Sequence, residues 1–180
     1  KQAAQVETPK AHWWPNFSLA SSWSKGDVVR IATDASSDTV FKGSMCFVAG
    51  NGDYRLRTRE TKASTDELEL EALTLALKYL LKVGARKAVI ESDSVAALEA
   101  VEQIVHKRGS KASRPGRTWR GVSSGARSRF QQAWGDIQGQ CEVDIRRVLG
   151  HAGDPLNRAA DQIAYMGLRA IAHPMKQSRE

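Results

Sequence analysis

The feature that most constrains this chain is a strongly β-forming stretch with a carboxylate at its end. Residues 28–36 read V-V-R-I-A-T-D-A-S, in which Val29, Ile31 and Thr33 favour a buried, pleated strand. Asp34 stands where that strand ends. A carboxylate at the end of a core strand costs free energy unless a cation lies against it. We therefore predict a cation site at Asp34, to which other acidic residues contribute.

The helix expected further along the chain supplies a second acidic residue. Residues 64–67, S-T-D-E, have the form of a capping box that opens a helix, and Gly84 ends it. Apolar residues at helical spacing form an inward stripe: Ala72, Leu73, Ala76, Leu77 and Leu80. Glu69 lies on this stripe, whereas Glu67 and Glu71 point elsewhere. We expect Glu67 and Glu71 to be solvated and Glu69 to have a function.

A third acidic residue, Asp93, follows residues 87–91, which predict a short buried strand. On its own, Asp93 is explained more simply as the N-cap of the next helix. The apolar residues of that helix are Val95, Leu98, Val101 and Val105. Together with Asp34 and Glu69, however, Asp93 has the position of a further metal ligand.

The fourth acidic residue, Asp161, belongs to the last predicted helix, which begins at about Asn157. One face of that helix carries Ala160, Asp161, Ala164 and Leu168, so Asp161 points inward. Four carboxylates cannot share one site while all are ionised unless cations neutralise them. Hard oxygen ligands select Mg²⁺ or Mn²⁺ rather than zinc. We interpret the four acids as one metal-binding cluster.

The remaining elements complete an α/β pattern. Residues 42–49 and 54–60 predict two more strands around a G-N-G-D turn, so the chain opens with a three-strand antiparallel meander. A helix at 126–137 and a strand at 142–149 precede the last helix. Strand–helix–strand units imply parallel pairing. We therefore predict a five-stranded mixed sheet, the meander plus parallel strands, flanked by helices on both faces.

We divide the chain into an N-terminal arm, one domain and a C-terminal tail, at residues 1–26, 27–173 and 174–180. The arm carries an aromatic cluster, H-W-W-P-N-F, at residues 12–17. Such a cluster either docks the arm onto its own domain, which we favour, or stacks on nucleic-acid bases.

The net charge of +7 is concentrated in one part of the chain. Residues 103–135 contain no acidic residue and eight basic ones, and a basic segment spans 107–129. A local basic block predicts a polyanionic partner, most often nucleic acid, and a solvated loop is the alternative. The residues predicted to contact nucleic acid are Lys107, Arg108, Lys111, Arg114, Arg117 and Arg120.

Other features of the composition concern the cellular environment. No apolar run approaches the roughly 20 residues that span a bilayer, and no signal-peptide pattern opens the sequence. Cys46 and Cys141 fall in predicted strands and suggest no disulfide framework, which fits a reducing compartment. We expect a cytoplasmic monomer without membrane association.

Four stretches together resemble type 1 ribonuclease H. They are T-D-A-S at 33–36, E-L-E-A at 69–72, S-D-S at 92–94 and G-H-A-G-D-P-L-N-R-A-A-D at 150–161. The last is the most specific, because a Gly-His-Ala-Gly loop with ten residues from His to Asp is hard to match by chance. The resemblance covers about residues 28–170.

The resemblance implies an RNase H-like fold and an endonuclease that cuts the RNA strand of RNA–DNA hybrids. It implies two Mg²⁺ ions, for which Mn²⁺ can substitute, acting by a two-metal-ion mechanism. Asp34, Glu69, Asp93 and Asp161 would be the catalytic metal ligands. His151 would be a mobile catalytic residue that assists proton transfer or product release. The basic segment lies where many members of the family carry a substrate-binding protrusion.

Some positions depart from the family pattern. Members often carry Asn-Asn before the glutamate and Gln two residues after the third acid, and these amides grip the hybrid in its minor groove. Thr65, Asp66 and Val95 stand there in this chain, and Ala35 stands where Gly is common. Two alternatives stay open: a nuclease for DNA or branched junctions on the same fold, and a non-catalytic nucleic-acid-binding module. Four retained carboxylates argue against the module, because without metal they would only repel phosphates.

Overall fold

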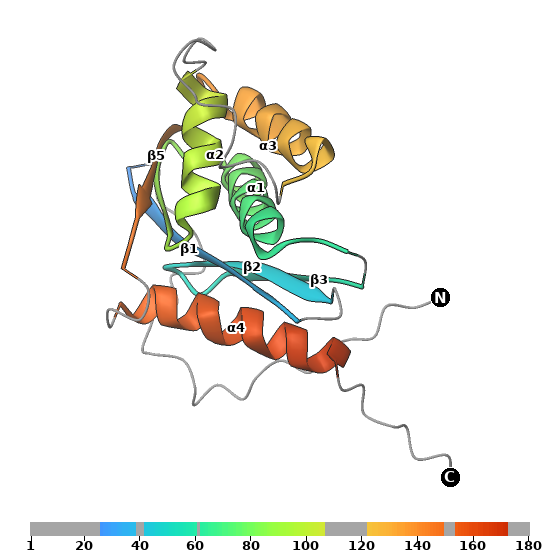
Figure 1. Ribbon diagram of the computed structural model, residues 1–180. Helices are drawn as coiled ribbons and strands as arrows, with labels where there is room; N and C mark the ends of the chain where they lie inside the picture. The colour runs from blue at the N-terminus through green and yellow to red at the C-terminus, as the bar shows by residue number, and fades with distance from the viewer. Residues whose placement is uncertain (1–25, 39–41, 61, 107–121, 150–153, 173–180) are drawn as a thin grey trace.

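The computed structural model describes residues 26–38, 42–60, 62–106, 122–149 and 154–172 (Figure 1). The elements follow the order β1 (Val28–Ser37), β2 (Gly43–Ala49), β3 (Tyr54–Arg59), α1 (Thr65–Val83), β4 (Lys87–Ser92), α2 (Val95–His106), α3 (Ser124–Ile137), β5 (Glu142–Arg147) and α4 (Pro155–Ala172). Every strand and helix expected from the sequence is therefore present among these residues.

The five strands form one mixed sheet in the order β3-β2-β1-β4-β5. β1 pairs antiparallel with β2, and β2 pairs antiparallel with β3. On the other side of β1, β4 and then β5 are added in parallel. The predicted meander with parallel strands added to it is thus confirmed, with β1 at the centre of the sheet.

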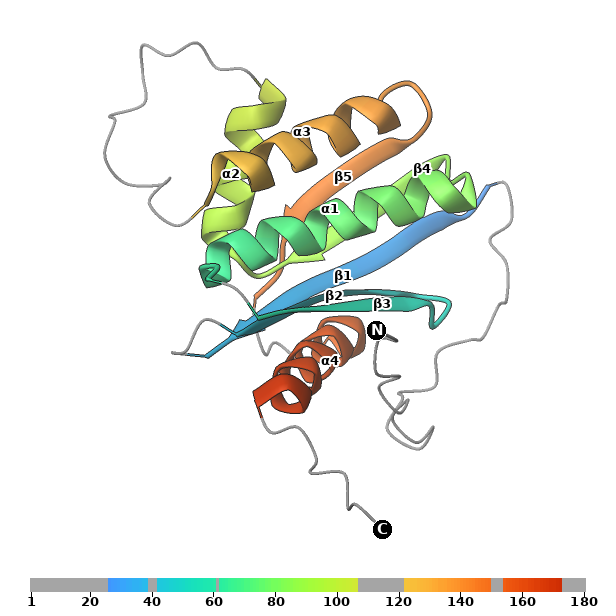
Figure 2. The same ribbon diagram turned by 90° about the vertical axis from the view of Figure 1, so that its right-hand side faces the viewer.

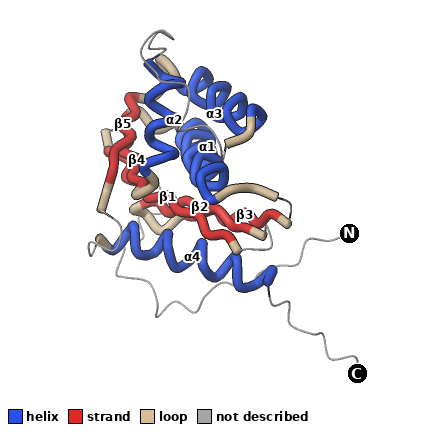
Figure 3. Tube along the Cα trace, viewed as in Figure 1, coloured by secondary structure: helices blue, strands red, loops and turns tan. Residues whose placement is uncertain are grey.

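Helices cover both faces of the sheet, as the sequence pattern predicted. α1, α2 and α3 lie on one face and α4 lies on the other (Figures 2 and 3). α1 packs directly on β1 and β2, and α4 crosses the opposite face over β1, β2 and β3. β2 is buried along its whole length because both α1 and α4 cover it. None of the described helices is both long and apolar enough to cross a membrane.

α1 begins and ends where its capping residues place it. The Ser64 side chain accepts a hydrogen bond from the Glu67 amide, and Gly84 adopts a left-handed conformation with φ of 66°. All five residues of the predicted stripe are completely buried: Ala72, Leu73, Ala76, Leu77 and Leu80. The stripe therefore fixes which side of α1 faces the sheet, and this side includes Glu69.

α4 is held on the sheet by small apolar residues and by side chains of the β2 segment. Ala160 and Ala164 pack with buried residues of the sheet such as Ala32. The Cys46 thiol donates to the Ala160 carbonyl at 3.2 Å, and the Ser44 hydroxyl donates to the carbonyl of Ala164. These contacts attach the middle of α4 to β2.

The predicted boundaries need small corrections. α4 begins at Pro155 rather than at about Asn157, because the Asp154 carboxylate accepts from the backbone amides two and three residues ahead and caps the helix there. β5 ends at Arg147, two residues before the predicted end, and Cys141 precedes this strand instead of lying in it. Residues 1–25 of the N-terminal arm lie outside the described residues.

Candidate metal centre

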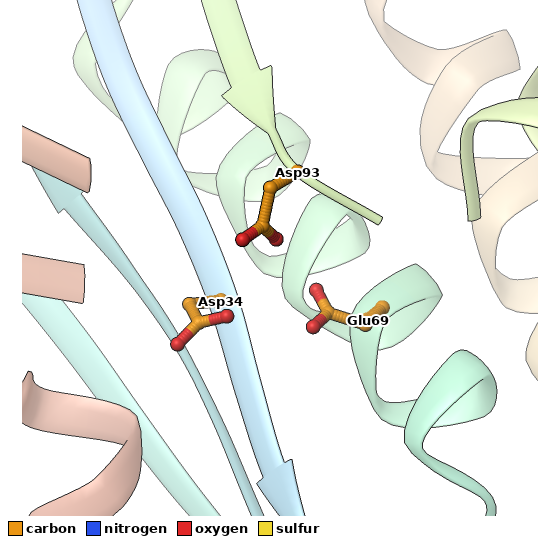
Figure 4. A group of neighbouring side chains, drawn as sticks. All are labelled: Asp34, Glu69 and Asp93. Carbon is orange, nitrogen blue, oxygen red and sulfur yellow. The ribbon is translucent and has the colours of Figure 1, made fainter. Parts of the chain in front are cut away.

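The register between β1 and β4 places two carboxylates at the same edge of the sheet. The last parallel pair joins Ala32 of β1 to Glu91 of β4. Two residues further along each segment stand Asp34, which is still in β1, and Asp93, which follows the end of β4, so the two residues lie next to each other (Figure 4). Because β4 ends at Ser92 while β1 continues to Ser37, the side of β1 beyond this pair is open.

Glu69 reaches this opening from α1. The Ala35 backbone amide donates to Glu69 Oε1 at 3.2 Å. The carboxylate therefore replaces the backbone carbonyl that a neighbouring strand would otherwise offer to this amide. Glu69 Oε2 is also buried, yet it has no hydrogen-bond partner among the described residues. A buried carboxylate oxygen without a partner is costly, and a bound cation would remove that cost.

The carboxylates of Asp34, Glu69 and Asp93 form a compact triad. One ligand atom from each residue lies within 4.8 Å of the others, and Figure 4 shows the three side chains converging from β1, α1 and the end of β4. The donor set is made only of carboxylate oxygens. Hard, oxygen-preferring cations such as Mg²⁺ or Mn²⁺ therefore fit these residues, whereas the nitrogen and sulfur ligands of typical zinc sites are not part of the triad.

Burial and repulsion between neighbouring carboxylates raise the pKa of two members of the triad. Burial, followed by the charges of Asp93 and Asp161, raises the pKa of Asp34 from 3.8 to about 7. Burial, followed by the charges of Asp34 and Asp93, raises the pKa of Glu69 well above its ordinary value. Near neutral pH and without a cation, Asp34 and Glu69 therefore retain protons that a metal ion would displace.

The simpler explanation of Asp93 as a helix cap does not hold. The hydroxyl of Ser94, and not the carboxylate of Asp93, accepts a hydrogen bond from the Ala97 amide at 3.2 Å. Ser94 is thus the residue that caps α2. The Asp93 carboxylate is left to the triad.

Asp161 lies close to the triad without belonging to it. It sits on α4, half-buried, and its charge contributes to the raised pKa of Asp34. The carbonyl of the preceding residue, Ala160, accepts a hydrogen bond from the Cys46 thiol, and Cys46 is directly opposite Asp34 in the β1–β2 ladder. The structure therefore brings three of the four predicted acids into contact range and the fourth next to them.

Other predicted functional residues fall outside the described part of the chain. They are His151 and the six residues Lys107, Arg108, Lys111, Arg114, Arg117 and Arg120.

The expectation that Glu67 is solvated is wrong. Glu67 is only 5% exposed, and it accepts from Arg59 at 2.7 Å and from the backbone amide of Ser123 at 2.9 Å. Burial alone would raise the pKa of Glu67, but these hydrogen bonds outweigh it and lower the pKa. Glu71 is also partly buried, with ion pairs to Arg59 and Arg129. These two acids join α1 to β3 and α3.

Sequence patterns alone also overlook Glu91, a carboxylate that is 2% exposed near the end of β4. Arg30 and Arg146, from the two flanking strands, pair with it. The available signal was a charged residue inside each of three predicted strands, two of which were expected to be buried. It could not be used without the strand order, which puts β4 between β1 and β5.

Comparison with known proteins agrees with this architecture. The sequence profile of the family described as RNase H matches residues 26–169, which is most of the chain. Among solved structures, the crystal structure of RNase H1 from the halophilic archaeon Halobacterium salinarum NRC-1 superposes with a TM-score of 0.56 at 17% identity. The match covers 79% of this chain and 98% of the archaeal one. No curated protein sequence matches significantly. The chain belongs to the RNase H family.

Proposed function

We propose that this protein is a metal-dependent endonuclease that hydrolyses the RNA strand of RNA–DNA hybrids by a two-metal-ion mechanism. One observation carries the proposal: the carboxylates of Asp34, Glu69 and Asp93 come together from three separate segments of a chain of this family. One of their oxygens, Glu69 Oε2, is buried without a hydrogen-bond partner among the described residues. An acidic triad of this kind would repel a nucleic acid unless it held cations.

Asp34, Glu69, Asp93 and Asp161 are the residues that would hold two Mg²⁺ ions, for which Mn²⁺ can substitute. Bound there, the ions would lower the pKa of an attacking water and stabilise the leaving 3′ oxygen of an in-line displacement at phosphorus. Glu69 is held in place by the Ala35 amide, so one of its oxygens is oriented before any ion arrives. The protons retained at Asp34 and Glu69 would leave on binding, which makes metal affinity depend on pH.

We propose two supporting roles on the basis of the sequence. His151 stands between Gly150 and Gly153, a context that suits a side chain which moves to carry a proton or assist product release. The basic segment would hold the phosphate backbone of the substrate, since arginine binds phosphate oxygens in bidentate fashion. We expect the protein to act as a monomer in the cytoplasm.

A nuclease directed at DNA or at branched junctions is the second candidate. Val95, where the family often has a glutamine, is 45% exposed and offers no hydrogen-bonding side chain. At Thr65, where the family often has asparagine, the side-chain hydroxyl is already hydrogen-bonded to the Ser37 hydroxyl at 2.7 Å. Both observations weaken reading of the ribose 2′-OH, which distinguishes RNA from DNA.

A cleavage assay decides between these functions. The purified protein is incubated with Mg²⁺ and with matched hybrid, duplex DNA, duplex RNA, single strands and a four-way junction, all of one sequence. We expect cuts only in the RNA strand of the hybrid. Cleavage of DNA or of the junction instead would establish the second candidate. Binding of the hybrid without cleavage of any substrate would establish a non-catalytic module and overturn the proposal.

A further inference from the structure

A group of four charged side chains, here called the strand-end ion network, lies beside the triad. Its members are Arg30, Glu91, Arg146 and Asp154. At its centre, both oxygens of the buried Glu91 are occupied: Oε1 accepts from Arg146 at 2.7 and 3.1 Å, and Oε2 accepts from Arg30 at 2.8 Å. Glu91 stands two residues before Asp93 on the same segment.

The network continues from the sheet to the start of α4. The same guanidinium nitrogen of Arg30 that contacts Glu91 lies 2.5 Å from Asp154 Oδ2. Asp154 Oδ1 accepts from the amides of Leu156 and Asn157 at 2.8 and 3.1 Å, and these contacts cap the helix. A continuous path of charged hydrogen bonds therefore joins β5, β4 and β1 to the first turn of α4.

Stability alone is a poor explanation for this arrangement. Buried ion pairs are often no more stabilising than well-packed apolar residues of the same size, but their geometry is specific. α4 already has an apolar face against the sheet and two further side-chain contacts, from Cys46 and Ser44. What the network adds is a fixed point at the helix N-terminus, relative to the strands that carry Asp34 and lead to Asp93.

We propose that Arg30 and Glu91 are positioning residues, which set where α4 begins and thereby place Asp161 at the metal site. Asp161 lies seven residues after Asp154, or about two helical turns along the same face. A shift of the capped end would move Asp161 by the same amount, because a helix moves as a unit. This inference rests on the proposed function, since it assumes that Asp161 contributes to binding the ions.

Two variants test the network without removing any proposed metal ligand. Asp154→Asn keeps the helix cap, because asparagine caps as well as aspartate, but it loses the charge attraction to Arg30. Arg30→Met cuts the path and leaves Glu91 paired with Arg146. The matched control is Glu142→Gln, which breaks the exposed Lys87–Glu142 ion pair between the same strands β4 and β5 at their other end.

Mg²⁺ binding is measured by calorimetry without substrate, and kcat and KM are then measured on the hybrid. We expect Arg30→Met to weaken Mg²⁺ binding about tenfold, the low end of the range for residues that orient metal ligands. We expect kcat to fall while KM stays close to wild type, Asp154→Asn to show the same trend, and Arg30→Lys to recover part of the loss. Glu142→Gln should match the wild type throughout.

Several outcomes would overturn the inference, and they are distinguishable from a failure of the proposed function. If Asp154→Asn and Arg30→Met melt at lower temperature but bind Mg²⁺ and turn over like the wild type, the network is merely structural. If Arg30→Met does not fold, the folded Asp154→Asn variant alone decides the question by the same criterion. If the wild type itself neither binds Mg²⁺ nor cleaves the hybrid, the proposed function fails and the inference fails with it.

Discussion

Asp34 is the residue at which folding and the proposed catalysis oppose each other. Its carboxylate is largely removed from water and faces other negative charges, so its pKa lies at about 7. We expect Asp34→Asn to abolish Mg²⁺-dependent cleavage while the unfolding free energy stays the same or rises, because the amide removes repulsion but is a poor metal ligand. Cleavage assays beside denaturant melts measure both effects. Full activity in a folded, metal-saturated variant would refute the central role of Asp34.

The same carboxylate should make the metal-free protein less stable as pH rises. A folded-state pKa of about 7 against an ordinary 3.8 means that the folded state binds more protons between these values, so stability is lost as pH rises through this window. We expect the melting temperature in EDTA to fall between about pH 4 and 7, to fall less in Asp34→Asn, and to recover with Mg²⁺. Identical pH profiles for wild type and variant would contradict this expectation.

His151→Ala should slow turnover without removing it. General acid–base assistance is typically worth about 10²–10⁴-fold, so a residual rate should remain measurable. Rate measurements are paired with thermal melts, because a histidine that only fills the core predicts the opposite pattern: lower stability with normal specific activity. The Gly-His-Ala-Gly context in the sequence favours the first outcome.

For single residues, the sequence predicts which side chains are buried better than it predicts which residues they contact. Helical spacing correctly placed Glu69 on the buried face of α1, and the end of β4 correctly located Asp93. Asp34 was expected at the end of its strand, but β1 continues three residues further, to Ser37, because β2 still pairs with it there. The same spacing assigned Glu67 to solvent, because its partners, Arg59 and the Ser123 amide, come from other elements. Periodicity describes one element at a time, whereas a buried charge depends on its neighbours across elements.

Among the elements, α4 is seated closely enough for one methyl group to matter. A Cβ at Gly167 would come within 2.7 Å of a Leu56 methyl carbon and 3.0 Å of Ser44 Cβ. Gly167→Ala should therefore destabilise the protein by about 1–2 kcal/mol, although alanine is the better helix former. Gly135→Ala in α3 is the matched control: nothing lies within 4 Å of its Cβ, and it should stabilise by about 0.5–1 kcal/mol. Chemical denaturation measures both, and a stabilising Gly167→Ala would show that α4 is seated loosely.

Element types and their order were predictable, but their ends were less so. The capping box and Gly84 predicted both ends of α1 because these signals are local. The start of α4 was misplaced because Asp154 is recognised as its cap only once the Leu156 and Asn157 amides are seen to donate to it. Strand order could not be obtained from periodicity, which is the same for every strand in the sheet.

At the scale of the whole molecule, the net charge of +7 is concentrated in the basic segment, which is separate in the sequence from the four predicted metal ligands. Changing Arg114, Arg117 and Arg120 together to glutamine should raise KM more than it lowers kcat. For every phosphate that the variant no longer binds, the plot of log affinity against log salt should become flatter by roughly 0.7–0.9. A control triple of Arg55, Arg57 and Lys78, which are exposed on β3 and α1, removes the same charge elsewhere. An unchanged slope in the first triple would mean that the basic segment is a solvated loop.

The hydrogen bond from the Ala35 amide to Glu69 makes this amide of the central strand sensitive to whether the carboxylate binds a proton or a cation. β1 runs on past its last pair with β4, so the acceptor of this amide is a carboxylate instead of a peptide carbonyl. The resonance of such an amide moves when its acceptor gains a proton or a cation. In a nitrogen–proton correlation spectrum, the Ala35 signal would thus follow Mg²⁺ loading with no substrate present, while the amide of Ala32, deeper in the sheet, would stay in place.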